Sequence, residues 1–193
     1  MAYLTRKQWI ELNAADVKEI TSGTGIFPET LMAIAIVESQ GKVNGVYYPG
    51  AGTLARLGNN FFGIKKGVGW KGDTITLNTP NDADPVSVFR KYSSFKESAK
   101  DFVNFLQKNP RYKKSGVFDA HDYVEQIIAI AKAGYAESPS YRDVITKVAG
   151  SVKSQIDKII APIKENGKFL PILIAGVVIT FFFISKKYKY GNN

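Results

Sequence analysis

A run of apolar residues that ends at a carboxylate constrains this chain more than any other feature. Leu31 to Val37 are seven consecutive apolar residues, in a segment that Pro28 opens and Gly41 closes. Proline suits the first turn of a helix and glycine suits its end, so we expect a helix over 28–41. Because this helix has no polar face, it should be buried on every side, at the centre of a hydrophobic core.

Glu38 is the unusual residue of this helix. It follows Ala35, Ile34 and Leu31 by three, four and seven positions and therefore shares their face. Apolar surroundings disfavour the charged form of a carboxyl group and raise its pKa toward the range of a general acid. From the helix alone, a glutamate that turns to water at the helix end is an equally good interpretation.

The composition excludes several kinds of site and partner. The chain of 193 residues has no cysteine and one histidine, His121, so we expect no metal, no cofactor and no Ser-His triad. Its formal charge of +9 favours a polyanionic partner, such as nucleic acid, an anionic membrane or a cell-wall polymer. The lysines are dispersed rather than gathered into one patch, which argues against nucleic acid.

Around the apolar helix, the sequence predicts a mainly helical α+β domain. Thr5 to Gln8 have the form of a capping box, which places a helix start near the N-terminus. Residues 42–58 are rich in glycine and tyrosine and are typical of a long loop. Two β-prone runs, 74–77 and 86–92, flank a turn-rich segment and predict a hairpin. Further helices are expected at 94–107, about 121–133 and about 139–149.

Five short motifs occur in an order and spacing that resemble a known family. They are Ile36-Val37-Glu38-Ser39, Asn59 to Lys65, Phe89 to Ser94, Asn109-Pro110-Arg111-Tyr112 and Ala133-Gly134-Tyr135-Ala136. Over roughly residues 5–149 the chain resembles glycoside hydrolase family 73, the glucosaminidase-type peptidoglycan hydrolases of flagellar rod proteins and autolysins. The resemblance implies a lysozyme-like helical lobe that faces a small β-hairpin lobe across a glycan groove. It also implies cleavage of the β-1,4 glycan backbone of peptidoglycan, as by an endo-β-N-acetylglucosaminidase.

The resemblance further implies roles for individual residues. Glu38 corresponds to the catalytic acid, and Tyr135 is expected to bond to the N-acetyl group or the attacking water unless it is a core tyrosine with a satisfied hydroxyl. Asn60 either donates to the substrate or fastens its own loop. Sugar rings stack on aromatic side chains, so the expected substrate-binding residues are Tyr47, Tyr48, Phe61, Trp70 and Tyr112.

One departure from the family concerns its second acidic residue, commonly a glutamate that follows a threonine. Here Thr79 is followed by Pro80, and the nearest carboxylates are Asp82 and Asp84, with Asp73 as a third choice. Glycoside hydrolysis needs a proton donor and also a base, a nucleophile or the sugar's own acetamido group. We predict Asp82 as the base, although ordinary turn chemistry accounts for both Asp82 and Asp84. The stereochemical outcome stays open.

The C-terminal part is predicted to be separate from an enzymatic domain at 1–149. Residues 150–168 have the pattern of an amphipathic connector, residues 169–185 carry no charge, and 186–193 form a basic tail. A helix over the 17 uncharged residues would extend about 26 Å, close to the thickness of a hydrocarbon core. We therefore expect a single transmembrane helix at 169–185 that binds a lipid membrane.

This topology bears on where such an enzyme acts. The N-terminus lacks the apolar run of a secretion signal, and lysines flank 169–185 on both sides without fixing an orientation. We expect a lytic enzyme anchored in a host or virion membrane, as in a bacteriophage that contains a lipid layer, and a cellular autolysin is the other origin considered. The alternative function is a catalytically impaired anchor that binds the cell wall.

Overall fold

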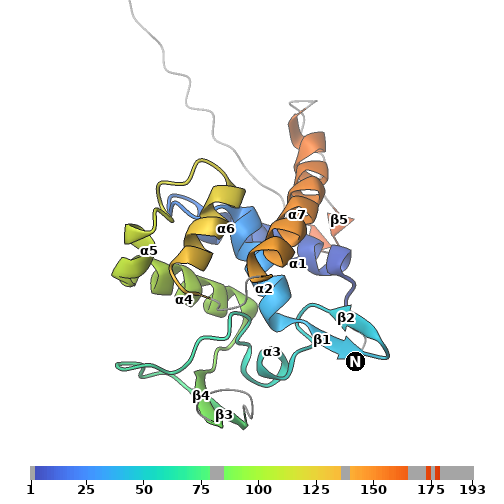
Figure 1. The fold of residues 1–193 in the computed structure, drawn as a ribbon. Coiled ribbons are helices and arrows are strands. Elements are labelled where there is room, and N and C mark those ends of the chain that lie inside the picture. Colours follow the sequence, from blue (N-terminus) through green and yellow to red (C-terminus); the bar gives the residue numbers. More distant parts are fainter. Residues whose placement is uncertain (1–2, 79–84, 136–139, 165–172, 175–176, 179–193) are drawn as a thin grey trace, which may run out of the picture. The chain divides into compact units, whose positions relative to one another are not determined.

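The computed structural model describes residues 3–78, 85–135, 140–164, 173–174 and 177–178. The chain divides into two units, Met1–Ile159 and Ile160–Asn193. Helices of the first unit (Figure 1) are α1 Arg6–Thr21, α2 Pro28–Ser39, α3 Thr53–Gly58, α4 Phe95–Lys108, α5 Pro110–Lys114, α6 Tyr123–Lys132 and α7 Tyr141–Lys164, which continues into the second unit. The strands are β1 Gly41–Val43, β2 Val46–Tyr48, β3 Thr74–Asn78 and β4 Val86–Arg90, and the second unit adds β5 Leu173–Ile174 and β6 Val177–Val178.

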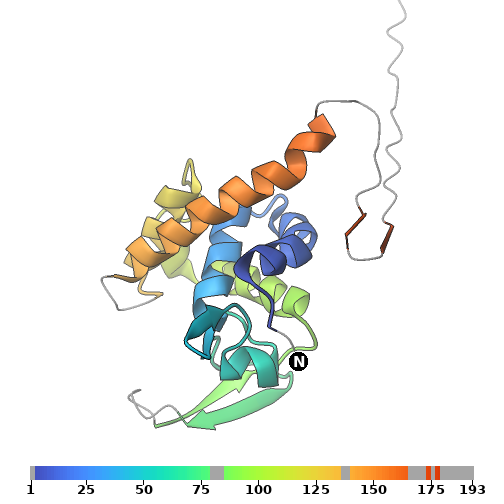
Figure 2. The ribbon, with the colours of Figure 1, turned by 90° about the vertical axis from the view of Figure 1, so that its right-hand side faces the viewer.

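Helix α2 is the centre of the core, as its apolar sequence predicts. Every residue from Thr30 to Ile36 is buried. The helix packs against α1, α3 and α6, and Figures 1 and 2 show it passing through the middle of the helical group. Burying one large aliphatic side chain stabilises a fold by roughly 1.5–3 kcal/mol, so the run of buried residues in α2 contributes substantially to the stability of this unit.

Helices α1 and α4 pack beside each other, and each begins with a side-chain cap, that of α1 as predicted. In the capping box of α1, the Gln8 amide N–H donates to Thr5 Oγ1 over 3.3 Å, and the Thr5 amide N–H donates to Gln8 Oε1 over 2.9 Å. The cap of α4 is Ser94, whose hydroxyl accepts from the Glu97 amide. Lys96 on α4 forms ion pairs with α1 through Asp16 and Glu19.

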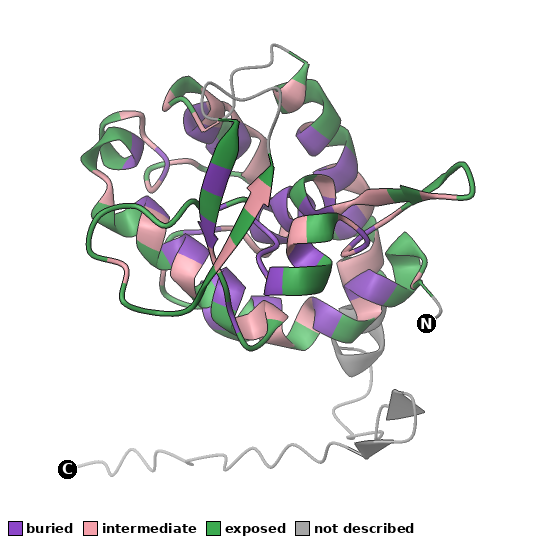
Figure 3. Cartoon of the chain, turned by 90° about the horizontal axis from the view of Figure 1, so that it is seen from below, coloured by how far each residue is buried: buried purple, intermediate pink, exposed green. Residues whose placement is uncertain are grey.

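The predicted hairpin is present as the antiparallel pair β3–β4, in which Thr74 lies opposite Arg90 and Asn78 opposite Val86. Buried and exposed residues alternate along β4 (Figure 3), as in a strand that covers a core with one face. Arg90 and Tyr92 fasten this hairpin to α4, because Arg90 Nη1 and the Tyr92 hydroxyl each contact Asp101 Oδ2 at 2.7 Å. Charge-assisted bonds of this kind are stronger than neutral ones.

The segment 42–58, expected to be an irregular loop, is more regular than predicted. It contains β2, most of β1 and α3, and β1 pairs with β2 so that Gly41 lies opposite Tyr48. Gly41 is required here for a close approach, since a Cβ atom on it would lie 2.5 Å from the carbonyl of Ala51. The sequence signal was weak because three-residue strands carry too few positions for an alternating pattern.

The predicted boundary between 149 and 150 is wrong, because both residues lie inside α7. Residues 150–168 are predicted to form a separate connector, but residues 150–164 continue α7. Val152 is fully buried and Ile156 packs against the core of the first unit. The apolar positions of the connector therefore hold α7 onto the core of the first unit, along the same stripe as Ile145 and Val148.

Most of the predicted transmembrane helix at 169–185 lies outside the described residues, as does the tail at 186–193. The four described residues of this segment form β5 and β6, which pair antiparallel. Among the helices that the structure describes, none combines the length and the apolar content needed to cross a membrane.

The packing of α7 predicts where this domain can be shortened. A chain that ends at Ile159 keeps Val152 and Ile156 and should unfold at the temperature of the full chain. A chain that ends at Gly150 loses both contacts, and burial of Val152 alone is worth roughly 1.5–3 kcal/mol, or about 3–12 °C in a domain of this size. Thermal unfolding followed by circular dichroism measures the difference. Equal midpoints for the two shortened chains would contradict the role given to α7.

Candidate active site

Glu38 lies in the last turn of α2, where this buried helix reaches the surface. The residue as a whole is exposed to solvent. Across from it lies Gly63, which has a φ of +64°, and a Cβ atom on that glycine would stand 3.9 Å from Glu38 Oε2. The carboxyl group is thus open to water on one side and bordered by backbone on another.

Burial raises the pKa of the Glu38 carboxyl group above its ordinary value, and the nearby Tyr141 hydroxyl opposes this rise. Exposure of the residue and partial burial of its carboxyl group are compatible, because a group that protein atoms border on one side touches water and still loses part of its hydration. Water contact limits the size of the rise but not its direction. Both interpretations from sequence hold in part: the residue is at a helix end, and its acid form is favoured.

Tyr135 and Tyr141 lie next to each other beside Glu38. Their ring centroids are 6.0 Å apart. The Tyr135 hydroxyl donates to the carbonyl oxygen of Phe62 over 2.8 Å, so its proton already has a protein partner. Burial raises the pKa of both phenols, which therefore stay protonated near neutral pH. The predicted bond from Tyr135 to the substrate stays a prediction, and it would have to use the oxygen lone pairs or break the bond to Phe62.

Asn60 fastens its own loop, the second of the two roles that the sequence left open. Its amide nitrogen donates to the carbonyl oxygens of Ile64 and Arg90 at 2.9 Å, and its Oδ1 accepts from the amide of Ile64 at 3.1 Å. The side chain is buried, with 1% of its surface exposed. With these bonds made, Asn60 has no amide hydrogen left for a sugar, and it instead holds the loop that carries Gly63.

Ser39, beside the acid, is a structural residue that the sequence analysis did not interpret. Its Oγ accepts from the amide of Gly50 over 2.9 Å, and its carbonyl oxygen accepts from the amide of Gly52 over 2.8 Å. These bonds tie the end of α2 to the chain segment that returns from the β1–β2 hairpin. The sequence feature that could have indicated this role is a serine directly after Glu38, followed by a glycine-rich segment whose backbone needs hydrogen-bond partners.

Two of the predicted sugar platforms are core residues instead. Tyr112 has no exposed surface, and its hydroxyl accepts from Arg111 Nη2 over 2.7 Å. Phe61 is 9% exposed and packs edge-on against Phe95, with ring centroids 5.2 Å apart. A ring that is covered by protein cannot stack on a sugar, so the prediction for these two residues is wrong. Burial of an aromatic ring depends on the tertiary packing, which the motifs do not encode locally.

The other aromatic candidates keep exposed surface. Tyr47 on β2 is 59% exposed, and Tyr48 is partly exposed beside it. Trp70 is partly exposed; its Nε1 donates to the Asp73 carbonyl oxygen over 2.9 Å, and the Arg90 guanidinium lies 4.7 Å from its ring centroid. Because Arg90 covers part of the indole, a sugar would stack on the part that remains open.

The second acidic group is not placed by the structure. Asp82 and Asp84 lie outside the described residues. Asp73 is exposed at the start of the hairpin, where its backbone carbonyl oxygen accepts from Trp70 and Lys91. No cluster of three or more His, Cys, Asp or Glu side chains suited to a metal ion occurs within the part of the chain that the structure describes.

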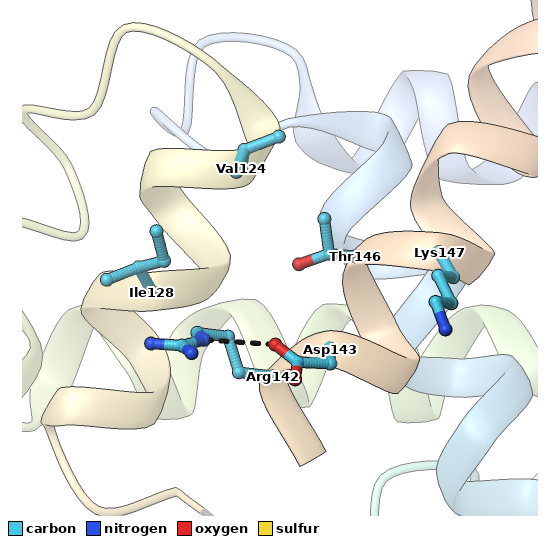
Figure 4. A pocket seen from close by; sticks show the side chains of 6 residues that line it. All are labelled: Val124, Ile128, Arg142, Asp143, Thr146 and Lys147. Atoms are coloured by element: carbon cyan, nitrogen blue, oxygen red, sulfur yellow. Dashed lines mark hydrogen bonds and ion pairs between the residues drawn. The ribbon is translucent and has the colours of Figure 1, made fainter. Parts of the chain in front are cut away.

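A separate hollow lies between α6 and α7 (Figure 4). It contains none of the predicted site residues, and Arg142 in it is paired with Asp143 over 3.3 Å. The lining side chains are Val124, Ile128, Arg142, Asp143, Thr146 and Lys147. We attach no catalytic role to this hollow, because its charged groups already include an ion pair.

The chain is similar to known proteins over most of its length. The family described as mannosyl-glycoprotein endo-beta-N-acetylglucosaminidase matches residues 14–154. The peptidoglycan hydrolase FlgJ of Vibrio parahaemolyticus is 35% identical over 135 residues, which are 67% of this chain and 42% of that protein. The exo-glucosaminidase LytG of Bacillus subtilis is 30% identical over 131 residues, which are 64% of this chain and 43% of that protein. The chain therefore spans less than half the length of these curated relatives.

Among solved structures, the glycoside hydrolase domain of Salmonella typhimurium FlgJ has a similar fold, with a TM-score of 0.61 and 25% identity. The similarity covers 83% of this chain and 96% of that domain. The catalytic domain of the autolysin Auto from Listeria monocytogenes has a TM-score of 0.61 at 22% identity, over 81% of this chain and 90% of that one. The mainly helical α+β architecture with small hairpins is thus one that these hydrolase domains share.

Proposed function

The chain belongs to the glucosaminidase family of glycoside hydrolases, and we propose that it cleaves the β-1,4 glycan backbone of peptidoglycan by the endo-β-N-acetylglucosaminidase reaction. The observation that carries the proposal is Glu38, which lies at the surface end of a buried helix and whose carboxyl group has a pKa raised by burial. A polyanionic wall also suits a chain with a formal charge of +9. The relatives called peptidoglycan hydrolase and exo-glucosaminidase support this substrate class.

In the proposed reaction Glu38 is the general acid. Its carboxyl group gives its proton to the glycosidic oxygen while the bond from the anomeric carbon to that oxygen breaks. The raised pKa keeps Glu38 protonated to a higher pH than an ordinary glutamate, so that the acid form is available before the reaction. Tyr47, Tyr48 and Trp70 offer exposed aromatic surface on which neighbouring sugar rings would stack.

A nucleophile must also attack the anomeric carbon. We propose that this nucleophile is a water molecule and that Asp82 is the base that activates it. Two carboxyl groups in an inverting enzyme stand about 6.5–9.5 Å apart, a gap that a hairpin loop is able to span. The competing route uses the 2-acetamido group of the substrate as an internal nucleophile, with Tyr135 as its partner. The two routes differ in the configuration of the product.

Membrane attachment through 169–185 is a separate proposal that rests on the uncharged sequence of this segment. It would hold the enzyme at a host or virion membrane from which the domain reaches the cell wall, in a bacteriophage with a lipid layer or in a cell. The alternative to an enzyme is an impaired anchor that binds the wall, and release of reducing ends from peptidoglycan separates the two.

Replacing the proposed acid should abolish lysis while the fold survives. Glu38→Gln removes the transferable proton but keeps the shape of the side chain, and loss of a general acid typically costs about 10²–10⁴ in rate.

In the wild type, activity should fall as the pH rises through the Glu38 pKa, because the reactive form is protonated. Release of reducing ends from purified peptidoglycan measures both effects. The matched control is Glu29→Gln in the first turn of the same helix, which should keep full activity. Near wild-type activity of Glu38→Gln would rule out the assignment.

The stereochemistry of the product distinguishes Asp82 from the substrate's acetamido group as the second catalytic group. If Asp82 is the base, Asp82→Asn should be nearly as inactive as Glu38→Gln, and Asp84→Asn should stay active because asparagine serves equally well in turns. NMR of the first-formed anomer gives an independent result. An inverted α-anomer agrees with water activation by Asp82, whereas a retained β-anomer assigns the reaction to the acetamido group.

The membrane proposal predicts a loss of binding on truncation. The full chain should sediment with vesicles that contain anionic lipids, and the chain that ends at Ile159 should remain in the supernatant with its hydrolytic activity intact. Equal sedimentation of both chains would show that 169–185 is not the anchor.

A further inference from the structure

The hydroxyl of Tyr141 is a buried polar group that the proposed reaction does not yet use. Its oxygen is shielded from solvent and has no hydrogen-bond partner among the described residues. Leaving a buried O–H unpaired is unfavourable, and native proteins rarely tolerate it without a reason. Tyr141 is also the first residue of α7, whose buried Ile145 and Val148 hold that end of the helix against the core.

The polar group beside this hydroxyl is the Glu38 carboxyl group. The Tyr141 ring lies 6.0 Å from the ring of Tyr135, whose hydroxyl donates to Phe62, the neighbour of the Gly63 that borders Glu38 Oε2. These contacts place the phenol in the cluster around the carboxyl group, and the two side chains alter the pKa of each other, although the strict geometry of a hydrogen bond is not met. The other described titratable groups that act on Tyr141 are Tyr135 and Tyr112. The Tyr141 hydroxyl forms no hydrogen bond with either of them. The Tyr135 hydroxyl donates to Phe62, and the Tyr112 hydroxyl accepts from Arg111. From the loop on the opposite side, Gly63 brings no side chain at all.

We propose that Tyr141 is a positioning residue whose O–H donates to the Glu38 carboxylate as Glu38 gives its proton to the glycosidic oxygen. This inference rests on the proposed function, because it takes Glu38 as the general acid. The proton moves from Glu38 to the leaving oxygen, that oxygen takes the electron pair of the broken bond, and Tyr141 keeps its own proton.

The contact would favour the transition state over the ground state. A hydrogen bond to a carboxylate is shorter and stronger than one to a neutral carboxyl group, so the bond tightens as negative charge develops on Glu38. Interactions that strengthen along the reaction lower its barrier, whereas those that are equal in both states do not. The loose geometry of the hydroxyl in the free enzyme agrees with a bond that forms fully only during the reaction.

Tyr141→Phe tests this role, because phenylalanine keeps the ring and its packing and removes only the hydroxyl. We expect kcat to fall about 10- to 100-fold, the usual effect of losing one hydrogen bond to a charged group, with KM little changed. The basic limb of the kcat/KM profile should move to higher pH, because Tyr141 no longer lowers the pKa of Glu38. The control is Tyr123→Phe, a partly buried tyrosine on α6 that should change neither quantity.

A direct titration makes the test independent of activity. The ¹³C signal of the Glu38 carboxyl group, assigned by its absence in Glu38→Gln, is followed with pH in the wild type and in Tyr141→Phe, and the pKa should be higher in the variant. An unchanged pKa together with unchanged kcat would overturn the role of Tyr141. A wild-type chain that releases no reducing ends would instead overturn the proposed function, and the titration would still show whether Tyr141 bonds to Glu38.

Discussion

Burial of α2 on all sides is the constraint on which the rest of the site depends. Because its side chains interdigitate with those of the helices around it, this helix cannot rotate or slide without disrupting a close-packed core. The last turn of the helix therefore presents Glu38 at a defined place, with its carboxyl group at the edge of the core. One packing requirement thus produces both the stability of the domain and the position of the acid.

Backbone hydrogen bonding builds the surroundings of that acid. Loops next to a core carry polar groups that must be paired, and here short side chains pair them. Asn60 satisfies both sides of the 60–64 loop, and Ser39 ties the end of α2 to the segment after the β1–β2 hairpin. Since Gly63 has no side chain, the loop approaches Glu38 without covering its carboxyl group. The support of Glu38 therefore comes from its neighbour Ser39 and from the 60–64 loop, and the phenols that lie near it come from segments still farther along the chain.

The difference between supporting and exposed aromatic residues shows where motif-based inference fails. Phe61 and Tyr112 belong to motifs of the family, yet both are covered by protein, whereas Tyr47 lies on a short exposed hairpin. The presence of a residue in a motif does not show whether it packs in the core or binds a substrate. Tyr141 is the converse case: it lies beside Glu38 because α7 packs on the core, although nothing near it in the sequence marks it.

The sequence by itself determined the central helix, its acid, the β3–β4 hairpin, the main helices and the family, since these depend on local periodicity, on caps and on the order of motifs. Only the tertiary structure decided that Asn60 fastens its loop, that α7 continues past residue 149 as part of the domain, and that Tyr141 packs beside Tyr135 near Glu38. Each of these outcomes depends on which surfaces meet when segments far apart in the chain pack together. Burial and hydrogen-bond partners are properties of that packing, so they cannot be assigned until the fold places both partners.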